Sequence, residues 1–415
     1  MIERTKYLEE LKKLKDKQVI KVLTGIRRSG KSTILEQFQA YLLNGGISAN
    51  NIISINLDDA DNNHLLNWST LHDYVTSKVK SKVDKYYVFL DEIQMVEQFE
   101  RCINSLLLRK NIDLYVTASN SYMLSGELAT YLSGRYMEIH VLPLSFSEYL
   151  TWYLTQYETK LNLLGTEARK SKDEIYNDYK EFGGFPYLIN FEQDETMMKK
   201  YLESVYNTVL MKDVVSRKKV KDTMMLDSIV KFLFDNIGSS VSTKKISDTL
   251  ASHGRKNSVH TVEAYVQALL DSFILYRVNR YDIKGKKFLK TQEKYYLSDL
   301  GLRTYLLGKS DGKDQGHILE NIVFLELKRR GYKVFIGKND TNEVDFVVED
   351  HNNVKYIQVS LTVRNDETLR RELRPLENIK DNYPKYLMTL DYDKNDFEGI
   401  KQISVIDFLS EKIDI

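Results

Sequence analysis

Residues 25–32 read Gly25-Ile26-Arg27-Arg28-Ser29-Gly30-Lys31-Ser32 and match the pattern G-x-x-x-x-G-K-[ST] in full. The run Val19–Thr24 before them is typical of a buried strand, and apolar residues recur at helical spacing after them, from Ile34 to Leu42. A glycine-rich turn between a strand and a helix surrounds an anion with backbone N–H groups and a helix amino terminus. The stretch therefore predicts a loop that binds the phosphates of a nucleotide.

Individual roles follow from the chemistry of this loop. Lys31 is expected to reach the β- and γ-phosphates, and the hydroxyl of Ser32 is expected to bind Mg²⁺. ATP and Mg²⁺ are the cofactors that the pattern predicts. The predicted nucleotide-binding residues are Gly25, Ile26, Arg27, Arg28, Ser29, Gly30, Lys31, Ser32 and Thr33.

A second half of the same site is expected at Tyr86-Tyr87-Val88-Phe89-Leu90-Asp91-Glu92, an apolar strand that ends in two acids. Asp91 is the predicted Mg²⁺ ligand, acting through water, and Glu92 is the predicted catalytic residue that polarises the attacking water. A strand that simply runs into an acidic turn is the plain alternative. The phosphate-binding loop earlier in the chain favours the functional interpretation.

Two further positions are catalytic candidates. The strand predicted at residues 113–119 ends near Ser119 and Asn120, which could sense the γ-phosphate or could cap the next helix. Arg135 is the first candidate for an arginine finger, because phosphoryl transfer spreads negative charge over the γ-oxygens. Arg28 is the second candidate, and an ordinary surface arginine is the alternative for Arg135.

Strands and helices alternate over residues 18–145, which predicts an α/β domain with a parallel sheet and helices on both faces. The five strands are expected at residues 19–24, 51–57, 86–90, 113–119 and 136–144. The pattern then changes near residues 150, 220 and 312. These changes predict four parts, at residues 1–150, 151–220, 221–311 and 312–415.

Here the sequence resembles a prokaryotic family of AAA-type (ASCE) P-loop ATPases whose carboxy-terminal domain has no assigned function. The resemblance spans nearly the whole chain. Besides residues 25–33 and 90–92, it rests on the blocks Leu142–Phe146, Phe182–Pro186, Lys212–Val214, Tyr295–Leu302, Leu319–Asn321 and Glu343–Phe346. It implies ATP binding and hydrolysis, and a carboxy-terminal domain similar to a degenerate restriction endonuclease.

The middle of the chain predicts three short helices, near residues 226–236, 242–250 and 260–272, followed by a hairpin. The hairpin segment 277–290 carries six basic residues against one acid, Asp282. This order is similar to a winged helix-turn-helix, in which the third helix can enter a DNA groove while the wing contacts phosphates. Winged helices also dock proteins, and a charged hairpin can merely be solvated.

The segment from residue 316 predicts helix, three strands, helix and strand, the order of a restriction-endonuclease-like core. An active member would bind Mg²⁺ with Glu320, Asp345 and an acid at position 358, and a lysine at position 360 would activate water. Gln358 and Ser360 stand there instead. The sequence therefore predicts a nuclease-like fold that does not cut DNA.

Composition limits the remaining choices. Lys and Arg total 60 and Asp and Glu total 59, so any nucleic-acid surface must be a local patch. Cys102 is the single cysteine, and no stretch has the ~18 consecutive apolar residues of a membrane span, so a cytoplasmic protein with no membrane partner is expected. The leading hypothesis is an ATPase that acts on or near DNA, with a homo-oligomer as one option. The rival is a slow ATP-dependent switch or scaffold that binds protein partners.

Overall fold

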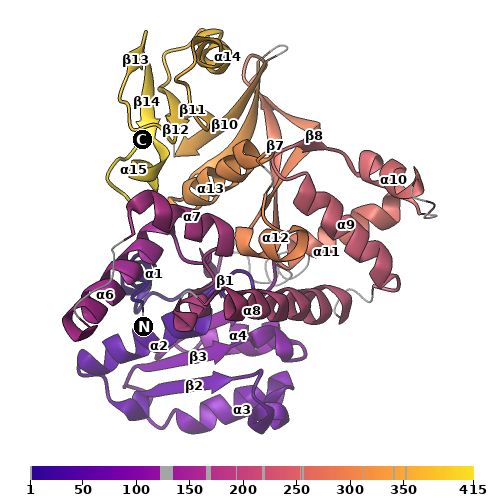
Figure 1. The fold of residues 1–415 in the computed structure, drawn as a ribbon. Coiled ribbons are helices and arrows are strands. Elements are labelled where there is room, and N and C mark those ends of the chain that lie inside the picture. The colour runs from indigo at the N-terminus through magenta and orange to yellow at the C-terminus, as the bar shows by residue number, and fades with distance from the viewer. Residues whose placement is uncertain are drawn as a thin grey trace. The chain divides into compact units, whose positions relative to one another are not determined.

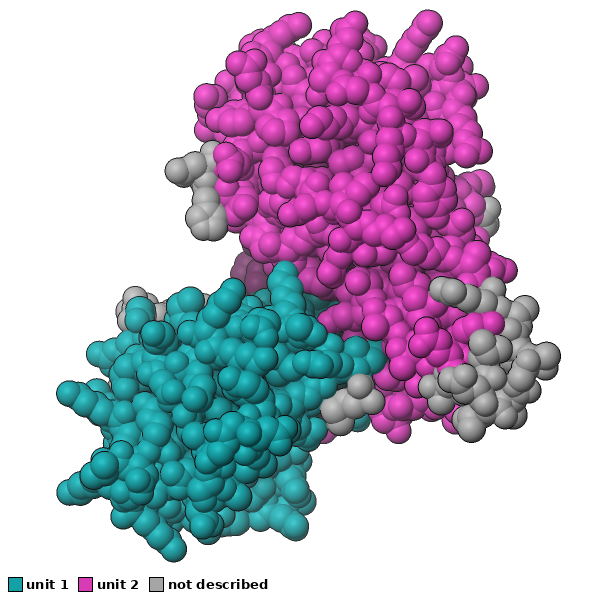
Figure 2. All heavy atoms as spheres, turned by 90° about the vertical axis from the view of Figure 1, so that its left-hand side faces the viewer, with its two compact units in different colours: residues 1–143, 271–273 teal, residues 144–270, 274–415 magenta. Residues whose placement is uncertain are grey.

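The computed structural model describes residues 2–121, 134–164, 170–192, 194–216, 220–252, 254, 257–310, 312–339, 342–350 and 353–415. The chain divides into two compact units, coloured separately in Figure 2. Unit 1 comprises residues 1–143 and 271–273, and unit 2 comprises residues 144–270 and 274–415. No described helix is both long enough and apolar enough to cross a membrane.

Unit 1 is built on the parallel five-stranded sheet that the alternation predicts (Figure 1). Its order is β2-β3-β4-β1-β5, and every neighbouring pair runs parallel. The strands are β1 (Ile20–Thr24), β2 (Ile52–Asn56), β3 (Tyr86–Asp91), β4 (Ile112–Ala118) and β5 (Tyr136–His140). The fifth strand was predicted to continue to Leu144. It ends earlier: the N–H of Val141 still donates to Thr24 O, but the N–H of Leu142 donates to the Tyr7 hydroxyl at 3.1 Å and so leaves the ladder.

Helices cover both faces of this sheet, as predicted. The helices are α1 (Thr5–Leu14), α2 (Lys31–Asn44), α3 (Trp68–Lys78) and α4 (Phe99–Leu107), with short 3₁₀ turns η1 (Ala49–Asn51), η2 (Ala60–Leu65) and η3 (Ile93–Met95). Apolar side chains of α3 and α4 pack on one face, against strand residues such as Val22 and Leu90. Side chains of α1 and α2 pack on the other face, against residues such as Leu23 and Phe89. The sheet is therefore buried on both sides, which explains its nearly continuous apolar strands.

Unit 2 begins with helices, as the sequence predicts for residues 145–215. They are α6 (Phe146–Leu164), α7 (Lys172–Phe182), η5 (Pro186–Phe191), α8 (Glu195–Thr208) and the π-helix η6 (Val209–Ser216). The next elements are α9 (Thr223–Asp235), β6 (Ser240–Val241), α10 (Thr243–Ser252), α11 (Val259–Asp271), β7 (Leu275–Asp282), β8 (Lys287–Leu297) and α12 (Leu300–Leu307). Three helices followed by a hairpin are thus present, with the short strand β6 added.

The carboxy-terminal elements follow the predicted order of helix, three strands, helix and strand. They are α13 (Gln315–Arg329), β9 (Lys333–Asn339), β10 (Asn342–Asp350), β11 (Asn353–Ser360), α14 (Asp366–Glu377) and β12 (Lys385–Thr389). The strands β13 (Asp396–Phe397) and β14 (Ile400–Ser404) and the helix α15 (Val405–Leu409) complete the chain.

One sheet of nine strands runs through unit 2, in the order β13-β14-β12-β11-β10-β9-β7-β8-β6. Strand β7 of the hairpin pairs in parallel with β9, so the hairpin and the carboxy-terminal strands belong to the same sheet. The predicted boundary near residue 312 therefore does not separate two sheets. The finer division at residues 150, 220 and 312 stays a prediction.

Two of the sequence blocks meet where α7 ends and α12 begins. The carboxylate of Asp299 accepts hydrogen bonds from the N–H groups of Gly184, at 2.7 Å, and Gly301, at 2.8 Å. Gly183 has φ = 76°, and a Cβ at this position would lie 1.9 Å from Asp299 Oδ1. Only glycine fits such a position, which gives the Phe182–Pro186 block a structural reason.

Candidate nucleotide site

The residues predicted to bind nucleotide gather at the carboxyl edge of the unit 1 sheet. The loop 25–30 follows β1, Asp91 and Glu92 lie at the end of β3, and Ser119 and Asn120 follow β4. Because β3, β4 and β1 are adjacent and parallel, their carboxyl ends meet at one edge. The sheet thus brings three segments that are far apart in sequence to one place.

The loop has the backbone that its glycines predict. Gly25 has φ = 140°, and a Cβ there would lie 2.1 Å from the carbonyl oxygen of Val141. Gly30 has φ = 96° and directly precedes α2. Lys31 is buried, and its Nζ donates to the carbonyl oxygens of Gly25, at 3.0 Å, and Ile26, at 3.1 Å. The ammonium of Lys31 is therefore held within the loop that it would share with phosphates.

Asp91 is placed as a metal-site residue would be. The hydroxyl of Ser32 lies next to its carboxylate, which accepts a hydrogen bond from Thr117 Oγ1. Burial raises the pKa of Asp91, and these two hydroxyl groups oppose the rise. The two residues predicted to bind Mg²⁺, Ser32 and Asp91, are therefore in direct contact.

Glu92 lies next to Asp91 in a left-handed backbone conformation with φ = 55°, which is uncommon for a residue with a side chain. Its N–H donates to Thr117 Oγ1 at 2.8 Å. Its carboxylate accepts hydrogen bonds from Ser119 Oγ, at 3.0 Å, and from Gln94 Nε2. Burial raises the pKa of Glu92, but Lys31 and Arg27 outweigh burial and the net pKa is lowered. The side chain is thus an ionised carboxylate, as a water-polarising group requires.

Arg27 connects the loop to two acids. Its guanidinium lies 3.8 Å from Glu92 Oε2 and 3.4 Å from Asp58 Oδ2. The sequence motif does not specify this position, so the contact could not be predicted from the motif. Arg27 therefore links the phosphate-binding loop to the Glu92 carboxylate through an ion pair.

Unused polar atoms lie in the same region. The buried Ser29 Oγ and Asn120 Oδ1 have no hydrogen-bond partner among the residues that the structure describes. A buried polar atom without a partner costs stability unless a ligand or water satisfies it. Together with the backbone of the loop and the Ser32–Asp91 contact, these atoms fit a bound Mg²⁺–nucleotide.

The two arginine candidates lie in different places. Arg28 lies in the loop, is exposed and has φ = 70°. Arg135 directly precedes β5, and its carbonyl accepts from Ile20 N at the start of β1. It is therefore at the amino edge of the sheet, a strand length of roughly 15 Å from the loop after Thr24. A finger role for Arg135 would require a neighbouring subunit.

Three residues near the site were not singled out from the sequence. Thr117 contacts both Asp91 and Glu92, and the period of two along β4, which pairs it with Ser119, could have indicated it. Gln94 follows Glu92 by two residues without any pattern of its own. Arg4 is buried and donates to the carbonyl oxygens of Ser29, at 3.2 Å, and Leu142, at 2.9 Å, yet its amino-terminal segment looks like an ordinary charged one.

A second cluster lies in unit 2, around the predicted nuclease-like positions. Glu320 is on α13, Asp345 is on β10, and Gln358 and Ser360 are on β11. Burial and the neighbouring Glu320 raise the pKa of Asp345 well above its usual range. The structure also places Lys294, from β8, against Glu320, which the sequence analysis did not anticipate.

Comparison with known proteins agrees with this geometry. Residues 17–150 match a family model described as an AAA domain, and residues 173–313 match a domain of unknown function, DUF8612. A Haemophilus influenzae protein is 38% identical over 410 residues, covering 99% of this chain and 98% of that protein. The protein MJ1544 of Methanocaldococcus jannaschii is 30% identical over 372 residues, covering 87% of this chain and 79% of that protein.

Among solved structures, the Walker-type ATPase paby2304 of Pyrococcus abyssi is similar, with a TM-score of 0.51 and 15% identity. The match covers 74% of this chain and 96% of that chain. At this level of identity the likeness shows a shared fold.

Proposed function

Because the chain belongs to the same protein family as the Haemophilus influenzae and Methanocaldococcus jannaschii proteins and carries an AAA domain, we propose that it hydrolyses ATP with Mg²⁺. The observation that carries the proposal is the contact series at the carboxyl edge of the sheet. Ser32 contacts Asp91, Thr117 joins Asp91 to Glu92, and Ser119 holds the Glu92 carboxylate.

Binding depends on the loop and on Lys31. The N–H groups of residues 25–33 and the amino terminus of α2 provide positive potential for phosphates. Lys31, whose Nζ donates to two loop carbonyl oxygens, would bind phosphate oxygens, and Ser32 and Asp91 would hold the metal ion. A bound Mg²⁺ would neutralise phosphate charge and orient the γ-phosphate.

Hydrolysis depends on Glu92. Its carboxylate polarises the attacking water, and Ser119 and Gln94 hold it in place. Arg27 lies 3.8 Å from the carboxylate oxygen that accepts from Ser119 and Gln94, Oε2. Asn120 is the proposed γ-phosphate sensor, because its side-chain N–H₂ can donate to phosphate oxygens and its buried Oδ1, which lacks a partner among the described residues, can accept from the attacking water.

The direct test is steady-state ATPase activity of the full chain, with Asp91→Asn and Lys31→Ala as variants. We expect wild-type turnover to require Mg²⁺, Lys31→Ala to lose tight ATP binding, and Asp91→Asn to need more Mg²⁺ for the same rate. Circular dichroism of each variant controls for folding. Unchanged kcat and KM in Lys31→Ala would remove the nucleotide assignment.

We also propose that unit 2 contains a winged-helix-like part and a nuclease-like part. The order α9, β6, α10, α11, β7, β8, with β6 paired to β8, supports the first. The order α13, β9, β10, β11, α14, β12, with β11 parallel to β12, supports the second. Exposed lysines at the hairpin turn, Lys284, Lys286 and Lys287, support a DNA-facing role.

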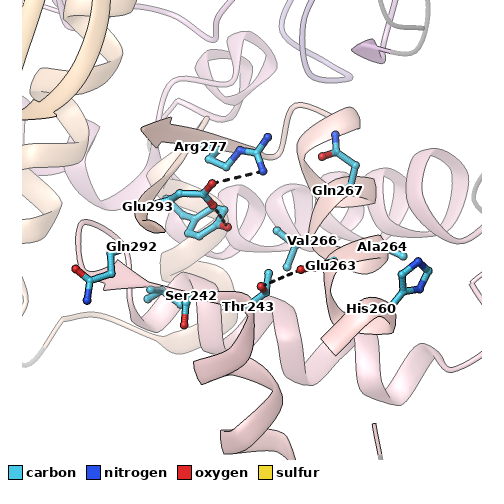
Figure 3. Close-up of a pocket in the computed structure, with 12 residues that line it drawn as sticks. Ser242, Thr243, His260, Glu263, Ala264, Val266, Gln267, Arg277, Gln292 and Glu293 are labelled. Atoms are coloured by element: carbon cyan, nitrogen blue, oxygen red, sulfur yellow. Dashed lines mark hydrogen bonds and ion pairs between the residues drawn. The ribbon is translucent and has the colours of Figure 1, made fainter. Parts of the chain in front are cut away.

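A pocket of about 520 Å³ favours the rival function, a protein-binding switch. It lies between the amino half of α11, the start of α10 and the hairpin (Figure 3). The outward residues of α11 in this pocket are His260, Glu263 and Gln267, with no lysine or arginine among them. Among the described residues that line the pocket there is one arginine, Arg277, and its Nη1 lies 3.8 Å from Glu293 Oε1. The Glu263 carboxylate on the face of the third helix repels DNA phosphates and suits a cationic protein side chain.

One experiment separates the two functions: ATPase measured with single- and double-stranded DNA at two salt concentrations. Stimulation by DNA that falls with salt supports action on DNA. Glu263→Gln is a matched variant, because it removes charge from the α11 face without changing size. If DNA has no effect on either protein, the protein-binding switch becomes the better hypothesis.

A further inference from the structure

The acidic centre of the nuclease-like part contains a lysine from outside that part. Lys294 is on β8, and its Nζ lies 2.8 Å from Glu320 Oε1 and 2.9 Å from Glu343 Oε1. The side chain is only 4% exposed. A buried ammonium is stable only when acids and hydrogen bonds surround it, so these two carboxylates compensate its charge.

Several other carboxylate oxygens of the centre are engaged as well. Glu320 Oε1 also accepts from Tyr296 OH, and Glu320 Oε2 faces His317 Nδ1 at 3.5 Å. Asp345 Oδ2 accepts from the N–H of Val359 at 2.8 Å. Protein donors therefore already engage these oxygens, which a metal ion would need as ligands.

Gln358 is engaged in the same way. Its Nε2 donates to Glu372 Oε2 at 3.0 Å, and its Oε1 accepts from Asp345 N at 3.4 Å. The backbone closes the centre further, because a Cβ at Gly238 would lie 2.8 Å from His317 Nδ1. Across the described residues, no group of three or more His, Cys, Asp or Glu is arranged to hold a metal ion.

We propose that Lys294 occupies the position that Mg²⁺ would take in the nuclease-like centre, so that this centre is an internal ion-pair site and not a divalent-metal site. An ammonium and a divalent cation cannot share Glu320 and Glu343 without strong repulsion. This inference goes beyond ATP hydrolysis and depends only on the nuclease-like order of elements proposed above.

Because Lys294 belongs to the hairpin strand β8, the centre also links the hairpin to the nuclease-like elements. Lys294 pairs in register with Ser240 of β6 and Val278 of β7, whereas its partners lie on α13 and β10. The ion pairs thus join the hairpin to the nuclease-like elements. Arg280 of β7 adds another ion pair between the hairpin and these elements, because its Nη2 lies 3.7 Å from Glu343 Oε2.

The test counts Mn²⁺ bound to the nucleotide-free full chain, by the electron paramagnetic resonance signal of free Mn²⁺. We expect no Glu320-dependent site in the wild type. We expect Lys294→Ala to gain about one site per chain, because oxygen ligands released from the ammonium suit a hard divalent cation. The double variant Lys294→Ala/Glu320→Gln should lose the gained site, which assigns it to this centre.

Two results would overturn the proposal. One is wild-type Mn²⁺ binding that disappears in Glu320→Gln, since the centre would then hold metal despite Lys294. The other is a folded Lys294→Ala or Lys294→Met protein that gains no site. Lys294→Met keeps the volume of the stem and serves if the alanine variant does not fold, and circular dichroism checks the fold of each variant, Glu320→Gln included. Plasmid and linear DNA incubated with the wild type in Mg²⁺ or Mn²⁺ should stay intact, and cleavage lost in Asp345→Ala would equally contradict the proposal.

Discussion

The Glu92 carboxylate is surrounded by side chains from three segments of unit 1: Arg27 from the loop, Gln94 from η3 and Ser119 just after β4. Thr117, near the end of β4, accepts from the backbone N–H of Glu92. The motif predicts where the loop and the two acids lie, because its residues are consecutive and their spacing encodes a backbone shape. It does not predict Arg27 or Gln94, because their contacts depend on side-chain directions that only the folded sheet defines. A site can therefore be predicted more completely from sequence where backbone groups bind the ligand than where side chains do.

Replacing Glu92 with Gln should keep ATP binding and reduce turnover by ~10²–10⁴, the usual contribution of a positioned proton-transfer group. The amide has the size of the carboxylate but cannot accept a proton from water. The measurement is kcat beside the dissociation constant for ATP, with Lys31→Ala as the variant that loses binding instead. A decrease of less than tenfold would place the catalytic role on another residue.

At the scale of elements, strand β1 contains a buried ion pair that its apolar pattern does not predict. Lys21 lies in the middle of a strand predicted as buried, and it is indeed buried, ion-paired with Asp113 of β4. Asp113 Oδ2 also accepts from Tyr115 OH and from the N–H of Asp16, each at 2.8 Å. The apolar runs predict where the strands lie. They do not predict the Lys21–Asp113 ion pair, because it joins residues 92 positions apart. Likewise, the parallel β7–β9 pair required knowledge of the sheet.

Asp113→Ala should destabilise unit 1 by about 3–5 kcal/mol, because it leaves the Lys21 ammonium buried without a counter-ion, with only the carbonyl oxygen of Lys17 as an acceptor. This corresponds to a decrease in melting temperature of roughly 6–20 °C. The double variant Lys21→Met/Asp113→Leu should melt closer to the wild type, since no buried charge remains. Thermal unfolding of all three proteins provides the comparison. A double variant that melts below Asp113→Ala would show that the ion pair itself stabilises the sheet.

The contact of Asp299 with Gly184 and Gly301, where α7 ends and α12 begins, should make the free energy of unfolding depend on pH. Burial raises the pKa of Asp299 to about 7, although backbone N–H groups of Gly184, Gly301 and Leu302 oppose the rise. The unfolded pKa is about 3.9, so the folded state favours the protonated form. This contribution is complete below pH ~4 and is lost as the pH rises through 7, a change of up to ~4 kcal/mol.

Asp299→Asn cannot ionise, so the stability of the wild type relative to this variant should fall as the pH rises from 5 to 8. Melting temperatures of both proteins across that range measure the effect. Asn keeps the size of the side chain but presents an N–H₂ group to backbone donors, so a constant offset between the two proteins is expected as well. A difference that stays constant with pH, or grows, would mean that Asp299 is ionised throughout.

For the whole molecule, the position of Arg135 bears on oligomerisation. It is exposed at the amino edge of the sheet, whereas the phosphate-binding loop is at the carboxyl edge. No rotation of one arginine side chain spans a strand length. The sequence could propose the finger but not the subunit that it serves, because distance across a sheet follows from strand direction and pairing.

We therefore expect Arg135 to act on the site of a second copy of this chain. Arg135→Ala should lower kcat by ~10³ or more while changing ATP affinity little, because a finger stabilises mainly transition-state charge. Mixing Arg135→Ala with Lys31→Ala should then restore activity above the sum of the two separate proteins. The reason is that a composite site can combine an intact Lys31 from one subunit with an intact Arg135 from the other. Size-exclusion chromatography with ATP checks that a mixed assembly forms. The matched control is Arg28→Ala mixed with Lys31→Ala in the same way. A loop residue acts within its own site, so an intact Arg28 on another subunit should not restore activity. If Arg135→Ala weakens binding and kcat equally, or if a mixed assembly forms without any gain in activity, the finger is not Arg135 and Arg28 becomes the candidate.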